Sequence, residues 1–291
     1  MLIRAGFEIR LSCPTALPVV MALSPHGSLV ARRQGRDGVS AGDGPALPHY
    51  VDAFGNRITR HVCPPGETTL TSDFVVEMPR EADPQHPGAR QMDVAELPHG
   101  VITYLLPSRY CDSDALLDVA WRLFARGPAG WGRVQAICDF VHTHVTFGYQ
   151  FGRPDKTASD VYREKSGVCR DFAHLAIALC RAMNIPARYA SGYLGDIDWP
   201  ASGPGDFCAW FEVYLEGGWH TFDARYNTPR VGRILMVRGP DAAQVAMITS
   251  FGPYTMTSFR VWADEIAETD DSALAGLLSR LPSVEAAPPI A

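Results

Sequence analysis

The chain has 291 residues, 46% of them hydrophobic and 20% charged, which is typical of a soluble globular protein with one or two domains. A formal net charge of −6 gives no support for a nucleic-acid partner, and no run of about 18 apolar residues indicates a membrane span. Seven cysteines, an odd number at irregular spacings, argue against a disulfide framework and favour a cytoplasmic location with reduced thiols.

The first part of the chain, residues 1–95, is expected to form a β-sandwich-like domain. Its opening residues, MLIRAGFEIRLSC, mix charged and apolar side chains, which indicates a strand rather than a secretory signal. Further strands are predicted at 17–23, on both sides of the Phe-Gly-Asn turn in AFGNRITRHV, and in TTLTSDFVVEM. The stretch 31–45, ARRQGRDGVSAGDGP, is polar and glycine-rich and is predicted to be a loop.

Amphipathic helices are predicted in the middle of the chain. Apolar residues recur at helical spacing in DSDALLDVAWRLFA, in GWGRVQAICDFVHTHV and in the segment that starts at Cys169. Beyond that helix, strand signals dominate, and FCAWFEVYLEGGWHTFDAR indicates a hairpin around Gly217-Gly218. This order predicts the α+β class, with a second domain over residues 96–268 and a tail over 269–291.

Cys169 is the first candidate for chemistry. It follows the turn Ser166-Gly167-Val168 and begins a long amphipathic helix, so its sulfur is expected at a helix N-terminus. The helix dipole and the free N–H groups at such an end stabilise a thiolate, and they can also bind a developing oxyanion. The sequence therefore predicts a nucleophilic cysteine here, whereas Cys138 and Cys180 lie on apolar helix stripes and are expected in the core.

The segments SGVCRDFAHLAIALCRAMNIPARYASGYLG and DFCAWFEVYLEGGWHTFDARYNTPRVGR resemble the transglutaminase-like superfamily, in particular small bacterial members with an N-terminal β-domain. The resemblance implies a papain-like fold, in which helices pack on an antiparallel sheet and a cysteine at a helix start faces a His and an Asp. It implies Cys169 as the nucleophile and Asp223 as the third member of the triad, while the histidine position falls on Cys208. No cofactor and no metal are expected.

Strand alternation decides which side chains of the hairpin share a face. Cys208, Trp210 and Glu212 fall on one face of the first strand. A two-residue turn at Gly217-Gly218 places Glu212 opposite Asp223, on the same face as Cys208 but offset along the sheet. The sequence thus predicts that Cys208 and Asp223 face the same side.

Aromatic residues near this face are candidate substrate contacts. Trp210 and Trp219 suit a peptide or an acyl chain, and they equally suit a sheet surface that other residues cover. Tyr149, in TFGYQFG, lies upstream where it can serve as a second oxyanion donor. The loop GYLGDIDWPASGPGDF is expected to form the rim of the groove.

The sequence offers no obvious replacement for the histidine. His174 lies five residues along the helix from Cys169, which turns it roughly 140° away from the thiol. His220 falls on the other face of its strand. His142 and His144 share neither one helix face nor the spacing of a metal pair.

The role of Cys208 is left open by the sequence. An uncharged thiol cannot act as an imidazolium, so it cannot protonate an amine leaving group in the usual way. A nearby Cys208 can form a disulfide with Cys169 that masks the nucleophile until it is reduced. Cys169, Cys208 and Asp223 can also be imagined as three zinc ligands.

Two functions follow from these residues. The first is a cysteine acyl-transfer protein of the protease, amidase or acyltransferase class, which works through a thioester on Cys169 and takes a peptide, a protein or an acyl-thioester as substrate. Because a thiolate leaves without a proton, activated acyl donors are expected to react better than plain peptides. The alternative is a catalytically impaired pseudoenzyme that binds a peptide or a protein partner in its papain-like groove.

Overall fold

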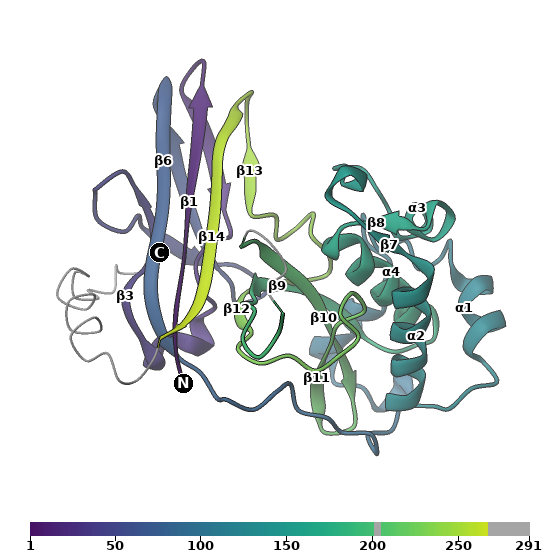
Figure 1. Ribbon diagram of the computed structural model, residues 1–291. Coiled ribbons are helices and arrows are strands. Elements are labelled where there is room, and N and C mark those ends of the chain that lie inside the picture. The colour runs from purple at the N-terminus through teal and green to yellow at the C-terminus, as the bar shows by residue number, and fades with distance from the viewer. Residues whose placement is uncertain (201–204, 267–291) are drawn as a thin grey trace.

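The computed structural model describes residues 1–200 and 205–266 and shows a strand-rich part beside a sheet that carries helices (Figure 1). The strands of the N-terminal part are β1 (Leu2–Cys13), β2 (Leu17–Met21), β3 (Arg33–Ala41), β4 (His49–Val51), β5 (Arg57–Cys63) and β6 (Gly66–Glu77). The helices are α1 (Leu117–Phe124), α2 (Trp131–His144), α3 (Ala158–Glu164) and α4 (Cys169–Ala182), with short 3-10 turns η1 (Gly27–Arg32), η2 (Val94–Glu96), η3 (His99–Leu105) and η4 (Tyr149–Phe151). The later strands are β7 (Thr146–Phe147), β8 (Ser166–Gly167), β9 (Ala187–Tyr193), β10 (Phe207–Leu215), β11 (Gly218–Phe222), β12 (Ile234–Gly239), β13 (Ile248–Ser250) and β14 (Thr255–Ile266). This mixture of helices and antiparallel strands confirms the predicted α+β class.

Two four-stranded antiparallel sheets make up the strand-rich part, in the orders β14-β1-β6-β3 and β13-β2-β5-β4. Alternation places Phe7, Ile9 and Leu11 of β1 on a buried face, and Leu17 and Val19 of β2 join the same core. The two sheets therefore share one hydrophobic interior, which accounts for the strand-rich N-terminal region that the sequence predicts.

The strands β13 and β14 come from the far end of the described chain. β14 pairs antiparallel with β1 along almost its whole length, and β13 pairs with β2. Residues 248–266 are thus part of the N-terminal sheets, although the sequence groups them with the expected domain 96–268. Strand periodicity shows that a segment is extended, but it does not show which strand is its partner. The expected tail, 269–291, lies outside the described residues.

The strand β3 corrects the prediction of a loop over residues 31–45. It pairs with β6 at the edge of the first sheet. Asp37 of this strand is buried, and its carboxylate binds the guanidinium groups of Arg33 and Arg57, each at 2.8 Å. The charged residues of this strand are neutralised by ion pairs, so a polar sequence can form a buried strand here. Such a polar, glycine-rich sequence is otherwise typical of a loop.

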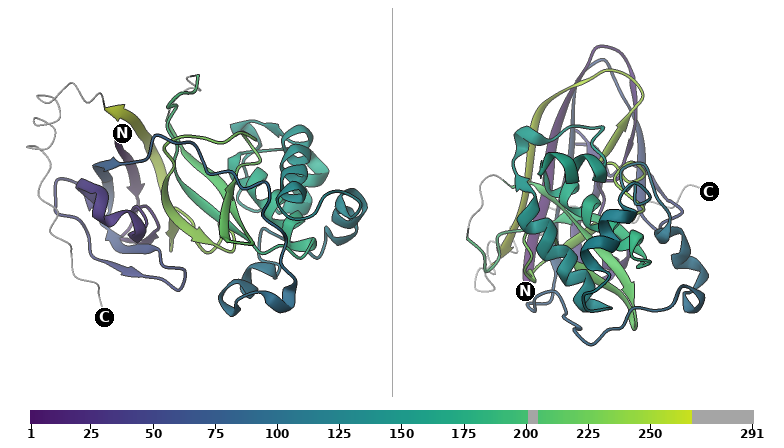
Figure 2. Two further views of the ribbon diagram at one scale, coloured as in Figure 1. Left: turned by 90° about the horizontal axis from the view of Figure 1, so that it is seen from below. Right: turned by 90° about the vertical axis from the view of Figure 1, so that its right-hand side faces the viewer.

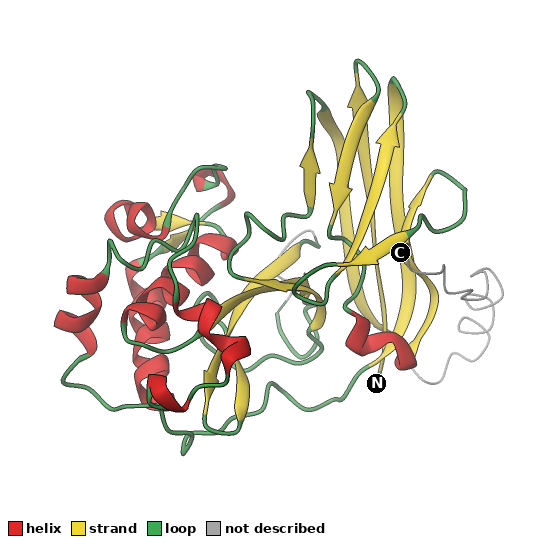
Figure 3. Cartoon of the chain, turned by 180° about the vertical axis from the view of Figure 1, so that it is seen from behind, coloured by secondary structure: helices red, strands yellow, loops and turns green. Residues whose placement is uncertain are grey.

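The third sheet, in the order β11-β10-β9-β12, lies between the strand-rich part and the helices (Figure 2). Figure 3 shows most of the helices gathered on one side of it, while η1 lies beside the strand-rich part. The long helix α4 packs on β10 and β9, where Ala209, Phe211 and Val213 are buried. Because α4 crosses this sheet, the first residue of the helix meets the first residues of β10.

The register of β10 and β11 differs from the prediction. The hairpin turns at Glu216-Gly217 rather than at Gly217-Gly218, so Glu212 pairs with Thr221 and not with Asp223. Gly217 has a φ of +89°, a value that favours glycine at this point of a tight turn. The corrected register moves the end of β11 along the sheet toward the start of β10, where the candidate site lies.

Phe207 anchors the start of β10 against the strand-rich part. Its ring meets Phe7 of β1 at a centroid distance of 6.0 Å and Phe259 of β14 at 5.9 Å, both edge to face. Tyr193 of β9 completes the cluster at 5.1 Å. The residue before Cys208 is therefore held by strands from both ends of the chain.

Candidate active site

The start of α4 is shaped by its own sequence. Asp171, in the first turn, is fully buried and accepts a hydrogen bond of 3.0 Å from the Val168 N–H. Gly167 leaves room for this carboxylate, because a Cβ at that position would lie 2.6 Å from the Cβ of Asp171. The Gly-Val-Cys-Arg-Asp motif thereby fixes the backbone around Cys169, the first residue of the helix.

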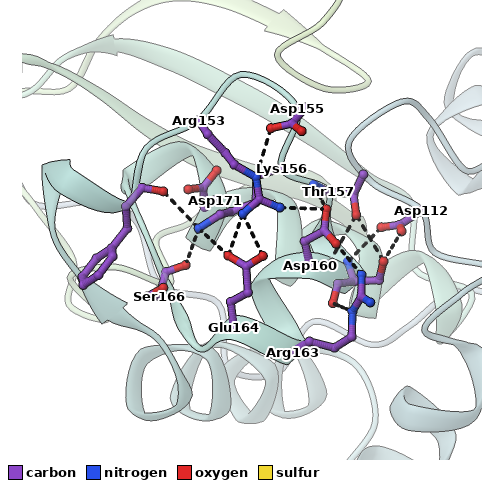
Figure 4. A network of polar contacts seen from close by, with 12 residues as sticks. Asp112, Arg153, Asp155, Lys156, Thr157, Asp160, Arg163, Glu164, Ser166 and Asp171 are labelled. Carbon is purple, nitrogen blue, oxygen red and sulfur yellow. Dashed lines mark hydrogen bonds and ion pairs between the residues drawn. The ribbon is translucent and has the colours of Figure 1, made fainter.

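A network of charged residues holds the segment that leads into α4 (Figure 4). Lys156 is only 1% exposed, and its Nζ donates to the carbonyl oxygens of Phe151 and Ser166, each over 3.0 Å. Glu164 neutralises this ammonium at 3.1 Å and also binds Arg153 at 2.7 Å. The loop before the helix is therefore tied to η4 and α3 by buried and partly buried charges.

Cys169 and Cys208 lie next to each other. Cys169 is partly exposed, Cys208 is 5% exposed, and both side chains line one pocket. The neighbouring Cys208 thiol lowers the pKa of the Cys169 thiol despite its burial, and the Arg225 guanidinium and the backbone of Ala209 act in the same direction. The neighbouring Cys169, burial and the Asp223 carboxylate raise the pKa of the Cys208 thiol well above its usual value. Cys169 is therefore the member of the pair that forms a thiolate.

The carboxylate of Asp223 is occupied by a cation. The Nη2 of Arg233 binds it at 2.9 Å, and the N–H groups of Arg225 and Tyr226 donate to it at 2.9 and 3.0 Å. Arg233 also binds Asp83 at 2.8 Å, and the side chains of all three ionic groups are almost buried. Asp223 therefore orients the loop that carries Arg225. In a Cys-His-Asp triad it would instead orient an imidazole ring.

Residues 120–224, which contain Cys169, Cys208 and Asp223, match the family model of the transglutaminase-like superfamily. The chain has a transglutaminase-like core. Its resemblance to this superfamily and its α+β fold, both expected from the sequence, are thereby confirmed.

Similar proteins extend the match beyond the transglutaminase-like core. A crystal structure from Cytophaga hutchinsonii, described as a candidate cysteine protease, has a TM-score of 0.79 and 27% identity and covers 92% of this chain and 91% of that chain. An uncharacterized Mycobacterium leprae protein is 26% identical over 184 residues, which are 60% of this chain and 64% of that protein. An uncharacterized Mycobacterium tuberculosis protein is 30% identical over 157 residues, or 49% of each chain. The chain thus spans between about half and just under two thirds of these two curated relatives.

The three aromatic residues predicted to contact substrate differ in burial and in their distance from the thiols. Tyr149 is 61% exposed and lines the pocket at Cys169. Trp210 is 2% exposed, packed with Ala190 and Leu235, and Trp219 lies against the Arg188 guanidinium at 3.8 Å, away from that pocket. Strand alternation shows which face of the sheet a tryptophan belongs to, but it does not show which residues cover that face. Trp210 is covered, Trp219 is half-buried, and neither lines the pocket at Cys169.

The histidines of the transglutaminase-like core are engaged elsewhere. His174 is fully buried, accepts a bond from the Ala242 N–H, and has its pKa lowered to about 3 by burial. His142 and His144 bind the carbonyl oxygens of Arg225 and Tyr162, and His220 contacts the carbonyl of its own hairpin turn. Within the described residues, none of them lines a pocket with Cys169 or Cys208.

Two adjoining pockets meet at the thiol pair. The larger has a volume of about 780 Å³ and contains Cys169 and Cys208, with an apolar wall from the N-terminal sheets that includes Ile9, Ile248, Met256 and Phe259. The smaller, about 340 Å³, shares Cys208 and contains Arg225. Tyr149, Asp206 and Phe207 line both pockets.

Sequence reasoning missed Asp206 and Arg225 as site residues. Asp206 precedes Cys208 by two positions, a spacing that already places both side chains on one side of the chain. Arg225 follows Asp223 by two positions, and its guanidinium lies 3.7 Å from the Phe147 ring centroid. Arg225 comes close to the thiols only through the long-range fold, so no local sequence pattern indicates it.

A metal centre finds no support in the described part of the transglutaminase-like core. Among the residues that the structure describes, no group of three His, Cys, Asp or Glu side chains is placed to hold a metal ion, which leaves the imagined zinc site at Cys169, Cys208 and Asp223 without structural backing. No helix in the described part of the chain is long and apolar enough to cross a membrane.

Proposed function

We propose that the protein is a cysteine acyl-transfer enzyme in which Cys169 forms a thioester with the acyl group of its substrate. The observation that carries this proposal is the partly exposed Cys169 thiol at the start of α4, with a lowered pKa and a large pocket in front of it. A thiolate at a helix N-terminus is the nucleophile that such chemistry needs, and the N–H groups there favour an oxyanion. The candidate cysteine protease from Cytophaga hutchinsonii supports the same class.

The acyl donor is expected to be activated. The resemblance to the superfamily places Cys208 at the position of a histidine, which would protonate an amine leaving group. The raised pKa of the Cys208 thiol makes it a poor acid. A thioester releases a thiolate, which needs no proton. An acyl-thioester is therefore expected to react faster than a peptide or protein amide, and the apolar wall of the pocket favours an apolar acyl group.

The direct test is to trap the acyl-enzyme. The protein is mixed with a thioester of a medium-chain fatty acid, and the acylated peptide is identified by mass spectrometry. Acylation is expected on Cys169 and is expected to disappear in Cys169→Ala. In Cys208→Ala acylation should persist on Cys169 but be slower, because the removed thiol lowers the pKa of the nucleophile and is not itself the acceptor. Acylation that persists in Cys169→Ala, or none in the unaltered protein, contradicts the proposal.

A pseudoenzyme that binds a peptide in the same groove is the second candidate. It is favoured by one observation, the engagement of Asp223 by Arg233 in place of an imidazole. The two functions differ in the reactivity of the thiol.

The pH dependence of Cys169 alkylation separates the two. Because the neighbouring Cys208 thiol lowers the pKa of Cys169, the rate of reaction with iodoacetamide is expected to reach half its maximum at a lower pH than for a free cysteine. The rate should then stay high as the pH rises and fall as the pH drops through the lowered pKa. A midpoint at or above that of free cysteine speaks for the pseudoenzyme.

A further inference from the structure

A carboxyl group and a phenol lie beside the thiol pair. Asp206 and Cys208 are two positions apart where the chain enters β10, so their side chains leave it on the same side. The phenol of Tyr149 lowers the pKa of the Asp206 carboxyl, and the two residues line the same pockets. Asp206 and Tyr149 line the large pocket together with Cys169 and Cys208.

The surroundings of Asp206 suit a group that gains and loses a proton. Burial raises the pKa of its carboxyl above the usual value, while bonds from Tyr149 and from the Phe207 backbone, and the charge of Arg225, oppose the rise. In turn, burial and Asp206 raise the pKa of Tyr149 to about 12, so this phenol stays a donor. The other acidic groups that line the two pockets are the thiols of Cys169 and Cys208, the carboxyls of Asp196 and Asp264, and the phenols of Tyr110, Tyr189, Tyr226 and Tyr254. The cations that line them are Arg109, Arg153, Arg170 and Arg225.

Other groups near the nucleophile are less suited to moving its proton. The Cys208 thiol donates to the carbonyl oxygen of Ala209 over 3.7 Å and has a raised pKa, and Asp223 is held by Arg233. The histidines of the described chain line neither pocket. The charge of Asp206 acts on Cys169, and both residues line the same cavity. Asp206 is therefore the carboxyl group placed to exchange a proton with the thiol.

We propose that Asp206 is the proton-transfer residue of the site, in place of an imidazole, and that Tyr149 positions its carboxylate. This inference rests on the proposed thioester chemistry of Cys169. It names the residue that allows a site without a histidine to react with donors whose leaving group does need a proton, such as an oxygen ester.

The proton cycle balances without a further reactant. The Asp206 carboxylate takes the proton of the Cys169 thiol, directly or through one water, and the thiolate forms a C–S bond to the acyl carbon. When the bond to the leaving group breaks, Asp206 returns the proton to that group. In the second half the carboxylate takes a proton from the attacking water or amine, the C–S bond breaks, and the proton returns to the departing sulfur.

Asp206→Asn is the direct test, because an amide keeps the shape and the acceptor for Tyr149 but cannot take a proton. Single-turnover acylation by an oxygen ester is expected to slow by about 100-fold, and acylation by a thioester much less. Alkylation of Cys169 by iodoacetamide at pH 7 is expected to become faster, since the negative charge that raises the pKa of this thiol is gone. Damage to the fold would slow both reactions.

The pH profile gives a second readout. Acylation of the unaltered protein is expected to fall as the pH drops through the raised pKa of Asp206, because the reaction needs the carboxylate. In Asp206→Asn this limb should vanish, and only the fall through the lowered pKa of Cys169 should remain. Tyr149→Phe changes an exposed residue and removes a bond that lowers the pKa of Asp206, so the limb should move to higher pH.

Asp264→Asn is the matched control, since Asp264 lines only the adjoining pocket. Its acylation rate and pH profile should equal those of the unaltered protein. If the unaltered protein is acylated and Asp206→Asn is acylated equally fast across the pH range, the inference is overturned while the proposed function stands. If the unaltered protein is not acylated at all, both are overturned.

Discussion

Arg233 joins two carboxylates that are far apart in the sequence, those of Asp83 and Asp223. The ion pairs measure 2.8 and 2.9 Å, and all three side chains are nearly buried. The guanidinium also lies 5.0 Å from the Trp210 ring centroid. Removal of the cation would leave two carboxylates without a counter-ion in a region of low dielectric, where an uncompensated charge is costly.

Arg233→Gln is therefore expected to lower the free energy of unfolding by about 3–5 kcal/mol, measured by urea denaturation. Arg80→Gln is the control, because the Arg80 side chain is 54% exposed and pairs with Glu265 at the surface. Loss of such a pair costs about 1 kcal/mol or less. Equal losses in the two variants would contradict a special role for the buried ion pairs.

The position of a single site residue is well predicted from the sequence when several local signals coincide. Cys169 follows a turn, begins a helix and carries a thiol, and the structure places it at the start of α4 beside a pocket. Arg225 and Arg233 act on the thiols through contacts between segments that are distant in sequence. No local pattern reveals such contacts, so these two residues emerge only from the fold, whereas the spacing of Asp206 and Cys208 is a local signal.

The junction between β8 and α4 is the element on which the nucleophile depends. Gly167, Val168 and Asp171 form a closed arrangement in which the carboxylate occupies the space of an absent side chain. The sequence predicts the turn and the helix start, but the capping of Val168 by a buried carboxylate appears only in the structure.

Gly167→Ala is expected to displace this junction, because the new Cβ would approach the side chain of Asp171 to 2.6 Å. We expect a loss of about 1–3 kcal/mol in unfolding free energy, and a large decrease in acylation of Cys169. Gly100→Ala, where nothing lies within 4 Å of the added Cβ, is the control and should leave both quantities unchanged. Normal acylation in Gly167→Ala would show that the junction tolerates the shift.

For the whole molecule, the main feature is the wall that the N-terminal sheets give to the pocket. Met256 and Phe259 of β14 face the cavity that contains Cys169, and Phe207 packs against β1 and β14. The α+β class follows from the sequence because strand and helix periodicities are local. The return of β14 to β1 does not, since either edge of a sheet can accept a strand with the same alternation.

Phe259→Ala should therefore alter substrate choice. With less apolar surface opposite the thiol, the kcat/KM for long-chain acyl thioesters is expected to fall by about tenfold, and that for acetyl thioesters to change little. Phe251→Ala, at a phenylalanine that is 66% exposed and outside the pocket, should have no effect on either. A uniform loss for short and long chains would indicate general damage instead.

The pairing of β14 with β1 also has a consequence for the order in which the protein is made. A growing chain that has just released α4 and β10 from the ribosome already has both thiols, but the strand that walls their pocket is still to be translated. Until then β1 presents an open edge to its surroundings. The thiol pair thus acquires its apolar chamber only after β14 has been translated, when the two ends of the described chain meet.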